Sequence, residues 1–345
     1  YKAFYTGKWH IPARKVEQSF DILAPDPKNN AATGDIVVTR SAQGFLRNYS
    51  GSDPFFLSVG LLNPHDICSF VLVHSVFQGR MPYRELVPEL PPLPANYDIA
   101  MKEPATIVTR REKYAGAHGI ESGIGNWEED LVRLYIWAYY RYIEVVDGQI
   151  GLILDALEAS KFARDTVVML TSDHGDGHMR HQMVFKSFLY DEAARVPFLM
   201  SWPGHIPAGV LDRTHLVSGV DVFPTVCDYA GIAPAPHMRG YSLRPLAEGR
   251  AKGGWRDFVV SHSGPGTMLR TNDHKYIAYK SDPVVQLFDM RNDPWETRNL
   301  AEETKHASLV EDHRKALEGF EATLVRAPER PPRWAKKGPA PEDEE

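Results

Sequence analysis

Apolar and polar positions follow a helical period over several stretches of the chain. Across residues 127–160 the apolar side chains recur mostly three and four positions apart, the spacing of one buried helix face. Residues 35–49 show the same spacing after an aspartate, so we expect a helix capped by Asp35. We expect further helices over residues 220–229 and 307–325.

Short apolar runs that end at turn residues predict strands. Residues 55–62 (FFLSVGLL), 166–171 (TVVMLT) and 196–201 (VPFLMS) are too short for typical helices, and the last two have the composition of buried parallel strands. Residues 87–96 (VPELPPLPAN) are rich in proline, which disrupts both helices and sheet ladders, so we expect an extended loop there.

The order of these elements predicts an α/β fold with a mostly parallel central sheet flanked by helices. After about residue 250 the pattern changes to short strand-like pieces, which predict a small antiparallel sheet followed by a helix. We therefore divide the chain into an α/β domain over 1–250 and a small α+β subdomain over 251–326. The proline-rich and charged residues 327–345 are expected to be a disordered tail.

Composition excludes several classes of protein. The 345 residues carry 39 Lys and Arg against 45 Asp and Glu, a net charge of −6, so a nucleic-acid partner is not expected. No apolar stretch approaches the length of a transmembrane helix, and we predict no membrane span. The two cysteines, Cys68 and Cys227, form no CxxC motif and are too few for a disulfide scaffold.

Candidate chemistry begins at the ends of the predicted strands. Asp173 and His174 directly follow residues 166–171, and in α/β sheets functional side chains lie just past the carboxyl ends of strands. An aspartate oxygen and a histidine nitrogen are metal ligands, which makes this pair a candidate metal site. A plain strand-end turn, with Asp173 capping a following helix, is the structural alternative.

Four further residues offer cationic or proton-carrying groups. Lys8 and His10 share one side of an extended segment and can hold an anion together, and His65 follows a strand and a proline. Lys186 lies thirteen residues after Asp173. Taken singly, each of these side chains is better explained by a surface or packing role.

The order of the motifs is more specific than any one of them, and it resembles the sulfatase family of the alkaline-phosphatase-like superfamily. The resemblance extends over about residues 3 to 301. Its motifs, in chain order, are Gly7-Lys8-Trp9-His10, Asn63-Pro64-His65, Ser172-Asp173-His174-Gly175-Asp176, His181 with Lys186, Tyr190-Asp191-Glu192-Ala193-Ala194-Arg195-Val196-Pro197-Phe198, Trp202-Pro203-Gly204, Asp221-Val222-Phe223-Pro224-Thr225, Gly240-Tyr241-Ser242-Leu243, Leu287-Phe288-Asp289, Asn292-Asp293-Pro294, Glu296-Thr297 and Asn299-Leu300.

The resemblance implies metal-assisted hydrolysis of a sulfate ester, expected to be that of a sulfated carbohydrate. Asp173 and His174 would be metal ligands for Ca²⁺, with Mg²⁺ as the alternative ion. The implied nucleophile is a formylglycine made from Cys or Ser in a C/S-x-P-x-R motif. The implied catalytic residues are Lys8, His10, His65 and Lys186, of which His65 and Lys186 would also bind the substrate, together with His181.

The sequence departs from the family pattern in one respect. The nucleophile motif and an Asp-Asp pair of metal ligands are expected before Gly7, and neither Cys68 nor Cys227 is followed by x-Pro-x-Arg. We therefore expect a sulfatase fragment that is inactive by itself. Family resemblance suggests a periplasmic or secreted full-length protein, although this chain carries no signal peptide.

Two alternatives remain open at this stage. The chain is a non-catalytic remnant that binds anionic glycans through Lys8, His10, His65 and Lys186, or it is a phosphatase or phosphodiesterase of the same superfamily. In either case, substrate specificity is expected in loops such as residues 82–125, which carry several arginines.

Overall fold

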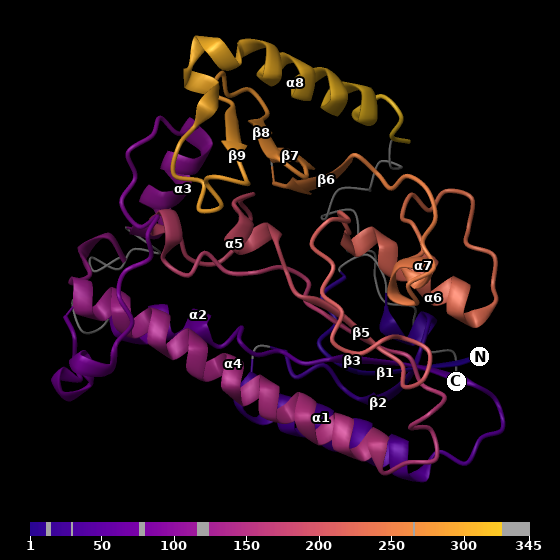
Figure 1. The fold of residues 1–345 in the computed structure, drawn as a ribbon. Coiled ribbons are helices and arrows are strands. Elements are labelled where there is room, and N and C mark those ends of the chain that lie inside the picture. Colours follow the sequence, from indigo (N-terminus) through magenta and orange to yellow (C-terminus); the bar gives the residue numbers. More distant parts are fainter. Residues whose placement is uncertain (12–14, 29, 76–79, 116–123, 265, 326–345) are drawn as a thin grey trace, which may run out of the picture.

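Within the described residues, the fold is built from three sheets and a pair of long helices (Figure 1). The computed structural model describes residues 1–345 except 12–14, 29, 76–79, 116–123, 265 and 326–345. The predicted tail over 327–345 therefore lies outside the described residues. The α/β class with a small antiparallel sheet towards the C-terminus is confirmed.

The first sheet is parallel and has the strand order β2-β1-β3. Its strands are β1 (Lys2–Gly7), β2 (Asp21–Ala24) and β3 (Phe55–Gly60), and β3 is the strand expected from the apolar run at 55–62. The register pairs Lys2 with Phe55 and Gly7 with Gly60, so β1 and β3 end side by side. Whatever follows these two strands starts from the same edge of the sheet.

The second sheet corrects one expectation. Strands β4 (Val168–Thr171) and β5 (Phe198–Ser201) form where strands were predicted, but they pair antiparallel. A parallel crossover usually carries a substantial helix across one face of the sheet, whereas the only α-helix between these strands is the short α5 (Asp191–Ala194). Strand β5 therefore runs back beside β4 in the opposite direction. Its four residues alternate between half-buried and exposed.

The long helices α1 (Ala31–Asn48) and α4 (Glu129–Glu158) run along each other below the sheets in Figure 1. Helix α4 confirms the helix expected over 127–160, and it packs against α2 (Ile67–Ser75) through Leu131, Leu134 and Tyr135. Helix α1 corrects the expected cap, because it begins at Ala31 with Asn30 as its N-cap. Asp35 is instead buried inside the helix.

The expected proline-rich loop is regular over part of its length. A 3₁₀ helix spans Arg84–Glu89 and includes Pro88, whereas the prolines that follow lie in irregular backbone. The expectation of an extended loop over 87–96 is therefore wrong at its first residues. A short 3₁₀ turn tolerates a proline that a longer α-helix would not.

The third sheet is antiparallel and has the order β6-β7-β8-β9. Its strands are β6 (Phe258–Ser263), β7 (Gly266–Thr271), β8 (His274–Tyr279) and β9 (Gln286–Asp289), and α8 (Ala307–Glu321) covers one face through Leu317. The remaining α-helices are α3 (Ala105–Ala115), α6 (Val222–Ala230) and α7 (Arg244–Ala247). Residues of β7 and β8 also share a hydrophobic core with Phe188–Tyr190. The proposed domain boundary near residue 250 stays a prediction.

Candidate active site

Two glycines allow β1 and β3 to meet where the site begins. Gly7 has φ +110°, and a Cβ built on it would lie 2.0 Å from the carbonyl oxygen of Gly60. Directly after this contact, the backbone N–H of Lys8 donates to the same carbonyl at 2.9 Å. Only glycine fits such a close approach, which places Lys8 at the carboxyl end of the sheet.

An ion pair joins the end of β1 to the end of β4. Lys8 Nζ lies 3.0 Å from Asp173 Oδ2, across 165 positions of sequence. Burial alone would raise the pKa of Asp173, but the hydrogen bond from Lys8 and the neighbouring His174 hold it below its usual value. Residues predicted separately at two strand ends therefore lie together.

His174 is oriented by the backbone of the residue that follows it. Its Nδ1 lies 2.8 Å from the carbonyl oxygen of Gly175, so Nδ1 carries the proton and Nε2 keeps its lone pair when the ring is neutral. Nε2 lies 3.5 Å from Asp173 Oδ2, a separation at which both atoms can bind one cation. Asp173 and His174 therefore fit a metal ion, although two ligands are fewer than Ca²⁺ requires.

His65 reaches the same region from the end of β3. Burial lowers the pKa of its imidazole, and Lys186, Lys8 and His174 lower it further. The next residue, Asp66, accepts the N–H groups of Ala31 and Ala32 at 3.3 and 3.1 Å and so fixes this turn to the start of α1. His65 is thus a neutral ring near physiological pH, close to two ammonium groups.

Lys186 lies in a segment of unusual backbone. Between residues 178 and 187 six non-glycine residues have positive φ, which is costly unless surrounding contacts impose it. Two of those contacts come from helix α3, where Arg110 donates to the carbonyl of Lys186 and Arg111 Nε donates to that of His181 at 3.0 Å. These arginines lie within residues 82–125, where substrate specificity was expected, and here they hold the segment in place.

Asp176 anchors the start of the segment over residues 178–187. Its carboxylate accepts the N–H of His178 at 2.8 Å and the hydroxyl of Tyr135 at 2.9 Å. Burial raises its pKa to about 6. The motif that predicted Asp173 and His174 contains Asp176, but nothing local in the sequence indicated that it would hold the start of this segment.

The structure brings together five of the seven predicted site residues, namely Lys8, His65, Asp173, His174 and Lys186. His10 is an exposed side chain after β1. His181 does not join the group, because it is 2% exposed and its ring stacks on Tyr190 at a centroid distance of 4.0 Å. Sequence reasoning missed Asp66 and gave Asp35 the wrong role, because the roles of both depend on tertiary contacts.

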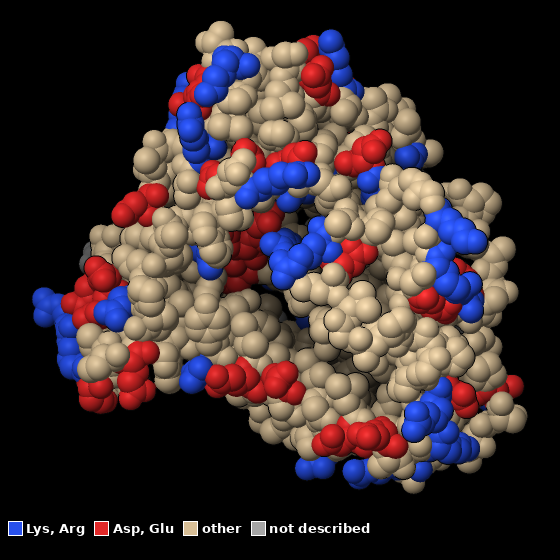
Figure 2. Space-filling view, viewed as in Figure 1, with Lys and Arg blue, Asp and Glu red and all other residues tan. Residues whose placement is uncertain are grey.

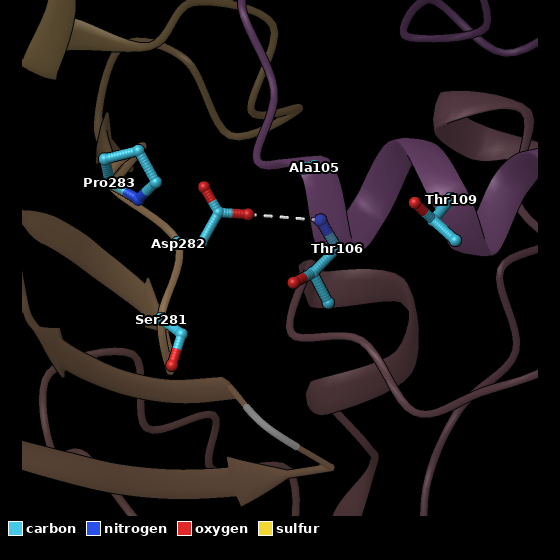
Figure 3. A pocket seen from close by; sticks show the side chains of 6 residues that line it. All are labelled: Ala105, Thr106, Thr109, Ser281, Asp282 and Pro283. Atoms are coloured by element: carbon cyan, nitrogen blue, oxygen red, sulfur yellow. Dashed lines mark hydrogen bonds between the residues drawn. The ribbon is translucent and has the colours of Figure 1, made fainter.

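Surface charge is mixed on the face shown in Figure 2, where Lys and Arg alternate with Asp and Glu around a central hollow. A separate open cavity of about 450 Å³ lies between α3 and the loop after β8 (Figure 3). It is lined mainly by small and hydroxyl side chains, and Asp282 there accepts the N–H of Thr106 at 3.1 Å. None of the predicted site residues lines this cavity.

Charged side chains gathered at the ends of the strands of an α/β scaffold are the arrangement in which α/β enzymes place their active sites. A sequence model of the family described as Sulfatase matches residues 5–232, and a model described as N-sulphoglucosamine sulphohydrolase, C-terminal, matches residues 179–323. The chain belongs to the sulfatase family. Among the described residues, no helix is long and apolar enough to cross a bilayer.

Similar proteins include several named sulfatases. The chain is 33% identical to the Delta 4,5-hexuronate-2-O-sulfatase of Bacteroides thetaiotaomicron, over 93% of this chain and 69% of that enzyme. It is 32% identical to Arylsulfatase K of Rattus norvegicus, over 77% of this chain and 49% of that protein. A solved 2-O glycosaminoglycan sulfatase superposes with a TM-score of 0.79 at 29% identity, over 93% of this chain and 72% of that one.

Proposed function

We propose that this chain forms the anion-binding part of an active site that hydrolyses a sulfate ester at the 2-O position of a hexuronate in a glycosaminoglycan. The observation that carries the proposal is the meeting of Lys8, His65 and Lys186 beside Asp173 and His174. The similarity to hexuronate and glycosaminoglycan 2-O-sulfatases supports the choice of ester.

The charges suit a sulfuryl group. The ammonium groups of Lys8 and Lys186 offer preorganised hydrogen bonds to oxygens that gain negative charge during transfer. Asp173 and His174 would hold a divalent cation, Ca²⁺ or alternatively Mg²⁺, which supplies Lewis-acid stabilisation when bound. His65, neutral in the free protein, is placed to hold a proton near the leaving oxygen.

The proposal includes a nucleophile from outside these 345 residues. The sequence has no C/S-x-P-x-R motif from which the family's formylglycine is made. Among the described residues, β3 pairs only with β1 and β4 only with β5, which leaves one open edge on each strand. All six residues of β3 are half-buried, although the run is largely apolar. An additional strand carrying the nucleophile and acidic ligands would pair with these edges.

Sulfate binding tests the anion site without requiring turnover. With Ca²⁺ present, we expect inorganic sulfate to bind the chain, measured by calorimetry, and Lys186→Ala to weaken binding by roughly tenfold or more because a charge-assisted hydrogen bond is lost. Lys280→Ala, which removes an exposed lysine after β8, is the matched control. Equal affinities for the two variants would remove Lys186 from the site.

Hydrolysis tests the assignment of substrate and nucleophile. We expect the chain alone to release no sulfate from a 2-O-sulfated unsaturated hexuronate disaccharide. Activity should appear when the chain is extended with a segment that carries C/S-x-P-x-R converted to formylglycine. Turnover by the chain alone, lost in Lys186→Ala, would show that the nucleophile is within these residues. Preferred cleavage of a phosphate ester by the extended protein would favour the phosphatase alternative.

A further inference from the structure

A second group of ligand atoms lies buried apart from Asp173 and His174. One ligand atom each from His181, Glu192 and Glu296 lies within 4.8 Å of the other two. His181 is 2% exposed, Glu296 is fully buried and the Glu192 side chain is 9% exposed. The three come from separate parts of the chain, namely the strained segment before Lys186, helix α5 and the loop after β9.

His181 and Glu192 are each held by one polar atom and leave another without a hydrogen bond. Glu192 Oε1 accepts from the Asn96 amide at 3.0 Å, and the His181 ring bonds the backbone of Trp295. The unpaired atoms are His181 Nε2 and Glu192 Oε2. Glu296 uses both oxygens, because Oε2 accepts the N–H of Asp191 at 2.7 Å and Oε1 lies 2.7 Å from the ammonium of Lys275. Outer partners of this kind are what orient the ligands of metal sites.

The two unpaired atoms are both acceptors when the imidazole is neutral. His181 bonds a backbone carbonyl through its other nitrogen, so Nε2 carries the lone pair. One ligand atom from each of the three residues lies close enough to the other two for a single cation to accept electron pairs from all three.

Neighbouring cations largely balance the carboxylates of this group. Lys275 is fully buried and is shared between Asp191 and Glu296, at 2.7 Å from each. Arg180 lies 3.8 Å from Glu192, and Arg195 lies 3.8 Å from Asp191. Glu192 is therefore paired less closely than Glu296.

We propose that His181, Glu192 and Glu296 bind a divalent transition-metal ion such as Zn²⁺ or Co²⁺. One nitrogen and two carboxylate oxygens suit these ions, whereas Ca²⁺ prefers an all-oxygen shell of more ligands. A metal here would tie the segment that carries Lys186 to α5 and to the loop after β9. The site is independent of the proposed sulfate-ester chemistry.

Cobalt provides a spectroscopic test on the whole chain. After removal of metals with EDTA, the variant Asp173→Ala, which disables the other candidate metal site, should bind one Co²⁺ per chain, with visible absorption typical of nitrogen and oxygen ligation. His181→Gln and Glu192→Gln in that background should lower Co²⁺ affinity by more than roughly tenfold. His237→Gln and Glu158→Gln, both at exposed positions, are the matched controls.

Two results would overturn the proposal. The first is that Asp173→Ala binds no Co²⁺ or Zn²⁺ by elemental analysis, in which case a proton rather than a metal fills the space between the acceptors. The second is that both His181→Gln and Glu192→Gln bind Co²⁺ as tightly as the controls do. Circular dichroism of each variant establishes that it is folded, and two separate ligand substitutions keep the test valid if one of them unfolds the chain.

Discussion

At the scale of single residues, backbone geometry decides where the cationic groups lie. Gly7 combines a positive φ with a neighbour that leaves no room for a Cβ, and Lys8 follows directly. The sequence indicated Lys8 through its motif, but only the contact with Gly60 explains why glycine precedes it. The close approach of β1 and β3 therefore helps to determine where Lys8 lies in the site.

Substitution of Gly7 tests this reasoning. Gly7→Ala should destabilise the protein more than Gly204→Ala, measured by urea unfolding. Both positions have positive φ, at a cost of about 1–2 kcal/mol for an L-residue. Open space surrounds the Cβ position of Gly204, whereas that of Gly7 meets the Gly60 backbone, so only Gly7→Ala also separates the strands. Equal losses would mean that strand contact contributes nothing.

The buried imidazole of His178 predicts a dependence on pH. Burial lowers its pKa to about 4, and the rings of Tyr139 and Tyr140 pack around it. The unfolded chain takes up this proton near pH 6.5, so the unfolding free energy should fall as the pH drops from about 6.5 to 4, by up to about 1.4 kcal/mol per pH unit. His178→Asn should flatten this slope in thermal or urea unfolding, and His237→Asn, at an exposed position, should not.

At the scale of elements, buried carboxylates fix the turns that follow the strands. Asp35 of α1 accepts the N–H groups of Leu62 and Asn63 at 2.6 and 2.9 Å, just before His65. Burial raises its pKa, while these two hydrogen bonds lower it. The helix thus sets the direction in which the chain leaves β3.

Loss of this carboxylate should affect both stability and anion binding. Asp35→Ala leaves two buried N–H groups without an acceptor and should lower the unfolding free energy by roughly 2 kcal/mol or more. Asp35→Asn keeps one acceptor and should fall between Asp35→Ala and wild type. Sulfate affinity should decrease in the same order, because His65 loses its fixed position. Asp21→Ala, at an exposed aspartate in β2, should change neither quantity.

Local pattern predicted elements well where a single period extends over many residues. Helix α4 and strand β3 formed as expected, whereas β1 (KAFYTG) mixes polar and aromatic residues and was not predicted. The direction of β5 was predicted incorrectly because an apolar run does not encode strand orientation. Asp35 resembled a cap, yet its partners lie 27 and 28 positions away. Motif order located Asp173 and Lys186, but it could not place His181 in a separate buried group.

At the scale of the whole molecule, the C-terminal sheet supports the site through buried charges. Lys275 of β8 holds Asp191 of α5, and the carbonyl of Ala193 in the same helix accepts the N–H of Gly175 at 2.9 Å. Gly175 directly follows His174. A lysine 102 positions after Asp173 is therefore linked, through one helix, to the turn that carries both candidate metal ligands.

Lys275→Met should therefore be among the most damaging single changes. It leaves Asp191 and Glu296 buried without their shared cation, and breaking a buried pair in this way costs about 3–5 kcal/mol. Burial, Asp191 and Glu192 raise the pKa of Glu296 to about 8 even beside Lys275, so without Lys275 this group is a neutral acid near pH 7. Glu296→Gln in the Lys275→Met background should therefore change the unfolding free energy little, whereas in the wild type it removes a partner of Lys275. Urea unfolding with EDTA present measures the double-mutant cycle, and Lys280→Met is the exposed control. Additive effects of the two substitutions would show that Lys275 and Glu296 act independently and that the link between the sheet and α5 lies elsewhere.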